Sequence, residues 1–216
     1  MPDVVIRSFR PEDRAAVRRI CCDTADKGKP VEGFFRDREA FADLITRYYT
    51  DYAPQGTWVA QQGQTVAGYL TGCFDTRRYW SIMVARVIPS ALIRALGRGT
   101  FLQAQTWGVV RAGIGTFFCG GFQEKVSLED YPAHLHINLL ADARGQHSGE
   151  RLIEGFIEQV KTRGLKGIHL VTRSDNAGAR RFFERRGFVE IGHCPVASLG
   201  GGGQDKRASV VYGLRL

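Results

Sequence analysis

The feature that most constrains the fold is a strand, turn, helix and strand in succession in the C-terminal half. His134–Leu140 alternates apolar with polar residues, as expected of a strand with one buried face. Gly149–Arg163 carries apolar residues at helical spacing, and Ile168–Thr172 has a second short strand pattern. Two strands joined through a helix lie parallel with a right-handed crossover. We therefore predict an α/β (α+β) fold whose sheet contains a parallel pair.

The other elements are expected to add antiparallel strands and further helices. A strand over Val4–Ser8 precedes a helix that opens at Pro11 and a second helix over Arg36–Tyr49. The remaining expected elements are a hairpin of Thr57–Gln61 and Val66–Phe74, a short helix from Pro89 carrying Leu92, Ile93 and Leu96, a helix over Asn176–Arg186, and strands over Phe188–Gly192 and Ser209–Leu216. The sheet should therefore be mixed, and residues 1–216 are interpreted as a single domain.

The composition favours a globular protein of a reducing compartment. Hydrophobic residues make up 44% of the chain, which is enough for a sizeable core. Its cysteines are scattered without metal-ligand spacing, which favours reduced thiols and a cytoplasmic location. The sequence has no run of 18 apolar residues and no signal-peptide pattern, so we expect neither a membrane span nor export. The formal net charge of +8 favours an anionic partner.

The turn before the central helix has features of a phosphate-binding loop. It reads Arg144-Gly145-Gln146-His147-Ser148-Gly149. Backbone N–H groups at a helix start have no partner inside the helix, and the helix dipole adds positive potential there. The two glycines allow a ligand to approach the backbone closely. By itself this turn is equally compatible with an ordinary strand-to-helix connection.

A second motif specifies a family. Asn176-Ala177-Gly178-Ala179-Arg180-Arg181-Phe182-Phe183 continues through Gly187-Phe188. Together with the turn, it resembles the two signature motifs of the GCN5-related N-acetyltransferases (GNAT), R/Q-x-x-G-x-G/A and N-x-x-A-x-x-F-Y-x-x-x-G-F. The resemblance implies the GNAT fold, a mixed and mostly antiparallel central sheet with a splayed parallel pair and helices on both faces.

A narrower resemblance is carried by Tyr131–Leu140, Cys22–Gly28 and Gly68–Gly72. These stretches look like bacterial relatives of the acetyltransferase-like domain of O-GlcNAcase. In those relatives the position of Asn138 is more often aspartate.

The family resemblance implies where acetyl-CoA would bind. The pantetheine arm would bond the backbone near Leu139 and Leu140 in the gap between the parallel strands, and an N–H near Leu140 would polarise the thioester carbonyl. The pyrophosphate would rest on the turn, and Phe183 would face the sulfur. The implied cofactor-binding residues are Leu139, Leu140, Arg144, Gly145, Gln146, His147, Ser148, Gly149, Asn176, Arg180 and Phe183.

Two positions depart from the family motifs. His147 stands where the first motif usually has glycine, and a side chain is tolerated there if the φ angle is ordinary. Phe183 stands where the second motif has a tyrosine that often protonates the leaving thiolate. A general acid is typically worth roughly 10²–10⁴-fold in rate, so turnover without that tyrosine is expected to be slow or absent.

His134, His136 and Asn138 are the candidate catalytic residues. They share one face of the central strand, where the family often has an acidic base. An imidazole could take the proton of an amine acceptor directly or through water. Alternatively, both histidines are half-buried structural residues. A metal site is not expected, because the H-x-H pair has no third ligand nearby in sequence.

The segment at about 76–130 is an arginine-rich insertion relative to the family pattern. Residues 76–123 contain six arginines and no aspartate or glutamate. Arg94 and Arg98 are expected on a different helix face from Leu92, Ile93 and Leu96. The insertion is compatible with a solvated face, with a wall that recruits an anionic acceptor or the 3′-phosphate of the cofactor, or with a nucleic-acid or oligomer surface, including a homodimer.

Three functions follow from these observations. The first is an acetyltransferase that moves an acetyl group directly from acetyl-CoA to an amine of an unidentified small molecule or protein. The second is an acetyl-CoA-binding module that has lost transfer, which Phe183 and Asn138 would explain. The weaker third is a basic nucleic-acid binder, for which the sequence contains no recognition motif.

Overall fold

The computed structural model describes residues 3–103, 106–107, 126–195 and 208–216. Its central feature is a seven-stranded sheet in the order β1-β2-β3-β4-β5-β7-β6. The strands are β1 (Val4–Ser8), β2 (Thr57–Gln62), β3 (Thr65–Cys73), β4 (Ala133–Leu139), β5 (Gly167–Arg173), β6 (Val189–Pro195) and β7 (Ala208–Arg215). Neighbouring strands are antiparallel except for the parallel pair β4–β5. The mixed, mostly antiparallel sheet is confirmed.

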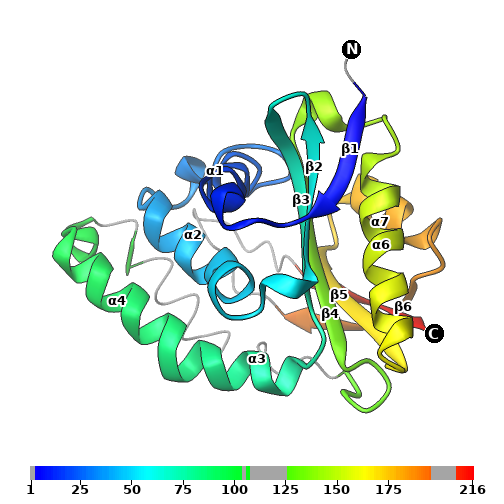
Figure 1. Ribbon diagram of the computed structural model, residues 1–216. Coiled ribbons are helices and arrows are strands. Elements are labelled where there is room, and N and C mark those ends of the chain that lie inside the picture. The colour runs from blue at the N-terminus through cyan, green and yellow to red at the C-terminus, as the bar shows by residue number, and fades with distance from the viewer. Residues whose placement is uncertain (1–2, 104–105, 108–125, 196–207) are drawn as a thin grey trace.

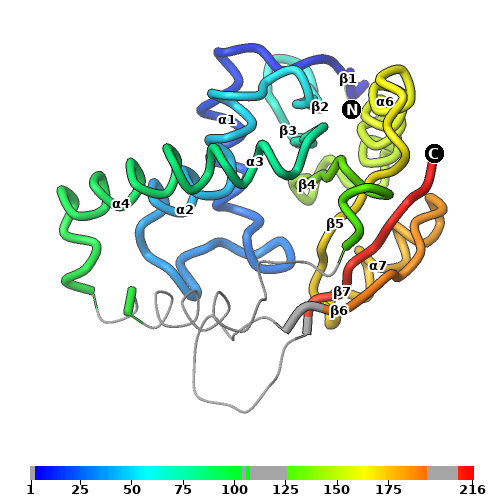
Figure 2. Tube along the Cα trace, turned by 90° about the horizontal axis from the view of Figure 1, so that it is seen from below, coloured from blue at the N-terminus to red at the C-terminus, as the bar shows by residue number. Residues whose placement is uncertain are grey.

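Helices cover both faces of this sheet, as the family resemblance implied (Figure 1). The helix α1 (Arg14–Asp23) and the helix α2 (Arg38–Arg47) lie on one face, and α6 (Ser148–Thr162) and α7 (Ala177–Glu184) lie on the other. Two more helices, α3 (Thr76–Ile82) and α4 (Ile88–Gly97), extend away from the sheet on the α2 side (Figure 2).

The parallel pair is splayed. β4 and β5 pair only at Ala133↔Ile168 and His134↔His169. Beyond these two positions each strand is held on its outer side instead, since β3 pairs with β4 as far as Leu139 and β7 pairs with β5 as far as Arg173. The C-terminal ends of β4 and β5 therefore face one another without a shared ladder.

Each face of the sheet buries its own hydrophobic cluster. On the α6 face, side chains from one stripe of that helix are fully buried: Leu152, Ile153, Phe156 and Val160. On the α1 face, Val17 and Ile20 pack against Val59 and Tyr69. Burying one such side chain fully is worth about 1.5–3 kcal/mol. Because side chains alternate along a strand, β4 places Leu135 in the α6 cluster and turns His134, His136 and Asn138 toward the α1 face.

The arginine-rich insertion folds differently from the sequence-based expectation. A continuous helical segment begins at Thr76, contains a π-helical stretch at Met83–Val87, and ends at Gly97, so Pro89 lies inside it. Leu92, Ile93 and Leu96 are exposed rather than buried.

Arg94 and Arg98 lie on the inner side of this helix. They pair with buried carboxylates that belong to Asp43 in α2 and to Asp37 at its N-cap, at 3.2 and 3.0 Å. These ion pairs lie on the same side of the helix as the buried Ala91 and Ala95, so charge pairing and apolar burial both orient the helix.

Among the described residues, Thr76–Gly97 is long and apolar enough to cross a membrane by length and composition alone. Those two properties do not distinguish a spanning helix from a helix of the domain. This segment carries Arg86 and Arg94 within it and packs its buried side chains against the rest of the protein.

The contact between β3 and α6 gives a stability prediction. A Cβ added at Gly72 would overlap the ring of Phe156, which is fully buried. We expect Gly72→Ala to lower the free energy of unfolding by about 1–3 kcal/mol through overpacking, measured by urea denaturation. The matched control is Gly155→Ala in α6, where the new methyl meets only Trp58 at 3.7 Å. That change should stabilise the helix by up to about 1 kcal/mol. Equal effects of the two substitutions would contradict this packing.

Candidate functional site

A groove of about 600 Å³ opens between the splayed ends of β4 and β5. Its walls come from the loop after α1, from β4, from the turn before α6, from β5 and from α7. The lining residues include Thr24, Ala25, Lys27, Gly28, His136, Asn138, Leu139, Arg144, Gly145, His147, Ser148, Gly149, Arg173, Asn176, Phe182, Phe183 and Arg185. Residues far apart in the sequence therefore meet in one cavity.

The edge of β4 that faces the groove is set by its pairing with β3. The N–H of Leu140 donates to the carbonyl of Ala67 at 2.9 Å, so it points away from the groove. Backbone groups alternate in direction along a strand, so those of Ile137 and Leu139 point toward β5. The carbonyl of Leu139 accepts a hydrogen bond from Arg144 Nε at 3.2 Å. The N–H groups available on this edge are therefore those of Ile137 and Leu139, next to Leu140, whose own N–H is used by β3.

The start of α6 presents donors that the helix does not use. Ser148 begins the helix, and the N–H of Arg151 is the first to find its partner four residues back, the carbonyl of His147. The preceding N–H groups have no helical partner, and no side chain caps the helix. The hydroxyl of Ser148 is buried and has no hydrogen-bond partner within the described part of the chain. Unused donors at a helix N-terminus fit a phosphate group.

The structure explains why both glycines of the turn are glycine. Gly145 adopts a φ of +77°, which favours glycine, and the space beside its Cα is open. At Gly149 a Cβ would lie 3.1 Å from Phe182 and 3.2 Å from Leu139, so glycine lets α6 start close to β4 and α7. The side chain of Gln146 is not part of the groove lining and instead donates to the carbonyl of Asp142 at 2.8 Å.

His147 does not have the ordinary φ angle that the sequence analysis allowed for. Its φ is +56°, in the left-handed region, so the family's usual glycine would be relaxed there and histidine is strained. The imidazole Nδ1 lies 2.8 Å from a carboxylate oxygen of Glu150, which also pairs with Arg186. Hydrogen bonds from His147 and Arg186 hold the pKa of Glu150 below its usual range. These contacts compensate the negative charge of Glu150, which is the only carboxylate that lines the groove among the described residues.

Four cationic side chains line the groove. Arg144 is positioned by Leu139 and packs against Gly28, whose φ of +91° requires glycine. Lys27, Arg173 and Arg185 complete the set. Sequence reasoning missed these three: Arg185 occupies an unspecified position of the second motif, and no signal marked Lys27 or Arg173.

An ion-pair cluster links two walls of the groove. Arg173 at the end of β5 pairs with Asp26 at 2.9 Å and with Asp175 at 2.7 Å. Lys27 pairs with Asp175 at 3.0 Å. Nearby positive charge, mainly the hydrogen-bonded Arg173, holds the pKa of Asp175 well below its usual range. The cluster therefore fixes the loop after α1 over the open end of the parallel pair.

The second motif contributes a helix cap and a packed ring. Asn176 accepts a hydrogen bond from the N–H of Ala179 at 3.2 Å and so caps α7, while the residue also lines the groove. Phe183 lines the groove but is 5% exposed and packs edge-on against Phe182 and Phe188. Arg180 is not among the lining residues.

Arg180 instead contacts the last strands of the sheet. Its Nε donates to the Tyr212 hydroxyl at 3.1 Å, and its guanidinium lies 3.4 Å from a carboxylate oxygen of Glu190. Both partners belong to β6 and β7, so the side chain is directed away from the groove.

The two β4 histidines have different surroundings. His134 Nδ1 contacts Thr76 Oγ1 at 2.7 Å, and Nε2 contacts the Tyr49 hydroxyl at 2.8 Å. The Thr76 hydroxyl donates to the carbonyl of Pro132, so it accepts from Nδ1–H, which leaves Nε2 to accept from Tyr49. Burial lowers the pKa of His134 to about 3. His134 is absent from the groove lining, and this arrangement matches the structural reading rather than a base.

His136 and Asn138 both reach the groove. Asn138 Nδ2 donates to the Tyr69 hydroxyl at 3.0 Å and lies 3.4 Å from His136 Nε2. Burial lowers the pKa of His136 to about 4, so the ring is neutral at pH 7. A neutral imidazole at this place can accept a hydrogen bond from a bound amine. Among the described residues, no group of three or more His, Cys, Asp or Glu side chains could hold a metal ion.

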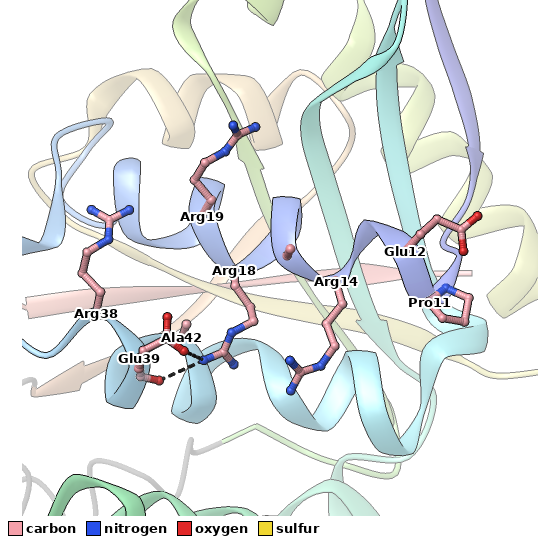
Figure 3. Close-up of a pocket in the computed structure, with 9 residues that line it drawn as sticks. Pro11, Glu12, Arg14, Arg18, Arg19, Arg38, Glu39 and Ala42 are labelled. Carbon is pink, nitrogen blue, oxygen red and sulfur yellow. Dashed lines mark hydrogen bonds and ion pairs between the residues drawn. The ribbon is translucent and has the colours of Figure 1, made fainter. Parts of the chain in front are cut away.

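A second cavity, of about 480 Å³, lies between α1 and α2 and is lined by arginines (Figure 3). Most of these arginines already have acidic partners. Arg18 binds Glu39 and Asp43, Arg14 binds Asp51, and Arg38 binds Asp23 and Glu32. The positive charge of this cavity is therefore largely compensated within the fold, unlike the donors at the start of α6.

Comparison with known proteins agrees with this geometry. The model of the acetyltransferase (GNAT) family matches residues 29–188. The chain belongs to the GNAT acetyltransferase family. A crystal structure of SsHAT is similar over 99% of this chain and 98% of its own, with 26% identity and a TM-score of 0.71.

More distant GNAT structures share the fold. The Salmonella typhimurium putative acetyltransferase yncA, with its cofactor acetyl-CoA, has 14% identity and a TM-score of 0.59, covering 98% of this chain and 93% of its own. The Drosophila melanogaster polyamine N-acetyltransferase has 15% identity and the same TM-score of 0.59, covering 99% and 100%. At these identities the likeness concerns the fold alone.

The strained turn gives a prediction that isolates the backbone. His147→Gly and His147→Ala both remove the imidazole and its exposed contact with Glu150, but only glycine relaxes at a φ of +56°. We expect the glycine variant to have the higher free energy of unfolding, by roughly 1 kcal/mol. Thermal and urea denaturation check this difference. An alanine variant as stable as the glycine variant would contradict the left-handed conformation.

Proposed function

We propose that this protein transfers an acetyl group from acetyl-CoA to an amine acceptor, directly and in the groove between β4 and β5. The observation that carries the proposal is the start of α6. Its unused N–H groups and the unpartnered, buried Ser148 hydroxyl line the same cavity as the free edge of β4. A phosphate-bearing ligand with an amide-containing arm fits both features.

Different parts of the ligand would contact different walls. The pyrophosphate would accept from the N–H groups of Ser148 and Gly149, with the Arg144 guanidinium beside it. The pantetheine amides would pair with the backbone of Ile137 and Leu139, much as an added strand does. The exposed side chain of Arg185 would contribute positive charge near the phosphates.

Acetyl-CoA supplies the acetyl group as a thioester. The amine nitrogen attacks the thioester carbonyl, a C–N bond forms, the C–S bond breaks, and coenzyme A leaves as a thiolate that takes up a proton. Of the two N–H groups on this edge, one would stabilise negative charge on the carbonyl oxygen during attack, and the other would pair with the pantetheine arm.

His136 would orient the amine rather than deprotonate a charged ammonium. With a pKa of about 4 it is a much weaker base than an amine whose pKa is near 10.4. Neutralising such an amine at pH 7 costs about 4.6 kcal/mol. We therefore propose that the groove binds the neutral amine or loses the proton through water.

Direct transfer is supported by the state of the thiols. Cys21, Cys22 and Cys73 are free and buried. Burial raises the pKa of Cys21 to about 12 and that of Cys22 and Cys73 to about 11, so these thiols are poor nucleophiles. Free thiols also support the proposal of a cytoplasmic location. The relation to O-GlcNAcase-like proteins remains a prediction.

The alternative is an acetyl-CoA-binding module without turnover. It is favoured by Phe183, whose ring lines the groove but has no acidic proton for the leaving thiolate. Steady release of coenzyme A with a panel of primary amines would support the enzyme. Binding without release across the panel would support the module.

Acetyl-CoA should stabilise the fold through mass action, by about 2.7 kcal/mol at a concentration 100 times the dissociation constant. Differential scanning calorimetry measures this as a rise in Tm. Gly149→Asp should weaken acetyl-CoA binding by about tenfold or more, since the new carboxylate would repel the phosphate. The helix itself should still form, because an acidic residue in the first turn is favourable. An unchanged Tm at millimolar acetyl-CoA would exclude the cofactor.

The matched control is Gly149→Ala. It adds the same Cβ against Phe182 and Leu139 without a charge, so the difference between the two variants isolates the electrostatic effect. If both variants bind acetyl-CoA equally well, the phosphate does not lie at the start of α6.

Asn138→Asp tests the groove end of β4. A carboxylate next to His136 should raise the pKa of that imidazole by about 1–3 units. Because the ring must be neutral to accept a hydrogen bond from the amine, we expect the lower limb of the kcat/KM profile to move to higher pH. Asn138→Ala, which removes the contact without adding charge, should not move the limb upward. An unchanged profile for the aspartate variant would rule out His136 as a titrating participant.

A further inference from the structure

The outer side of the α3–α4 segment is an apolar surface that no described part of the protein covers. The inner side of Thr76–Gly97 is buried against the domain through Met83, Val87, Ala91 and Ala95. On the outer side, Val84 is 63% exposed, Ile93 70% and Leu96 64%, and Leu92 is 47% exposed. Leu92 and Leu96 are four residues apart and so lie on one face of α4.

Six of the ten large hydrophobic residues found exposed in the described chain lie between 84 and 107, so the exposure is concentrated in this part of the sequence. Four of them belong to the helical segment itself. Concentrated apolar exposure of this kind marks an interaction surface. We call Val84, Leu92, Ile93 and Leu96 the outer apolar face.

Within the helical segment itself, the charged side chains have one sign. Arg94 and Arg98 point inward to Asp43 and Asp37, where they are compensated. Arg77, Arg78 and Arg86 are exposed, and the described part of the chain gives them no ion pair. Residues 76–123 include no aspartate or glutamate. The face therefore combines apolar side chains with uncompensated positive charge.

These properties fit a lipid surface better than a second copy of the chain. Two copies joined through this face would bring the same arginines together with no acid from the segment between them. Anionic headgroups supply the missing negative charge, and each nearby basic residue contributes to binding. Exposed leucine and isoleucine on one side of a helix that also carries exposed arginines are typical of helices that lie in the plane of the interface.

We propose that the outer apolar face of α3–α4 docks this protein on an anionic lipid surface. The helix lies on that surface and does not cross it, since its inner side remains packed against the domain. No groove-lining residue belongs to this face, so the proposal stands independently of the proposed acetyl transfer.

The test is co-sedimentation of the full chain with vesicles of phosphatidylcholine containing one third phosphatidylglycerol, and with pure phosphatidylcholine vesicles. We expect binding to the anionic vesicles at least tenfold stronger, and weakened by added salt. Ile93→Glu combined with Leu96→Glu should reduce it at least tenfold. Arg77→Gln combined with Arg86→Gln should reduce binding to anionic vesicles only.

The matched control is Val189→Glu combined with Val5→Glu, at exposed positions of β6 and β1 that are 59% and 56% exposed. This control variant has the same change in net charge, but away from the outer apolar face. It should bind the anionic vesicles nearly as strongly as the wild-type chain. Circular dichroism and the Tm of each variant verify folding without reference to catalysis.

Three results would overturn the proposal. One is the absence of vesicle binding by the wild-type chain. Another is an equal loss of binding in the Ile93/Leu96 and Val5/Val189 variants, which would mean that net charge alone drives the contact. The third is a concentration-dependent dimer in analytical ultracentrifugation that Ile93→Glu dissolves, which would assign the face to a second copy.

Discussion

The separation of β4 from β5 is the constraint on which the site depends. These strands share a ladder for only two residue pairs, and β3 and β7 then hold their outer edges. Backbone donors and acceptors on the inner edge are left for a ligand. The strand direction at Leu140, whose N–H is used by Ala67, decides which residues present them. The groove therefore exists because β4 and β5 are each paired along their outer edges but separate from one another.

Packing on the α6 face brings the phosphate-binding turn to this gap. The fully buried stripe of α6 lies across the sheet, and Gly72 and Gly149 allow the close approach of Phe156 and Phe182. The helix N-terminus then faces the same cavity as the β4 edge. His147 has a strained left-handed conformation at that point. The packing of α6 stabilises the turn enough to offset the free energy of this strain.

Charge organises the opposite side of the molecule. Buried acids on and beside α2 pair with Arg94 and Arg98, and Leu92, Ile93 and Leu96 of α4 are exposed. The cluster of Lys27, Asp26, Arg173 and Asp175 fixes a loop over the groove in a similar way. Pairing of charged side chains here decides orientation, which matters more for function than the small stabilisation expected of exposed pairs.

The sequence by itself determined the strand order, the mixed sheet, the family and the phosphate-binding turn of the groove, because periodicity and glycine positions are local properties. Only the tertiary structure decided that His136 reaches the groove while His134 is enclosed by Tyr49 and Thr76, and that Arg180 points to Tyr212. It also decided which face of α4 is exposed and brought in Lys27, Arg173 and Arg185. These outcomes depend on partners distant in sequence, which no local pattern specifies.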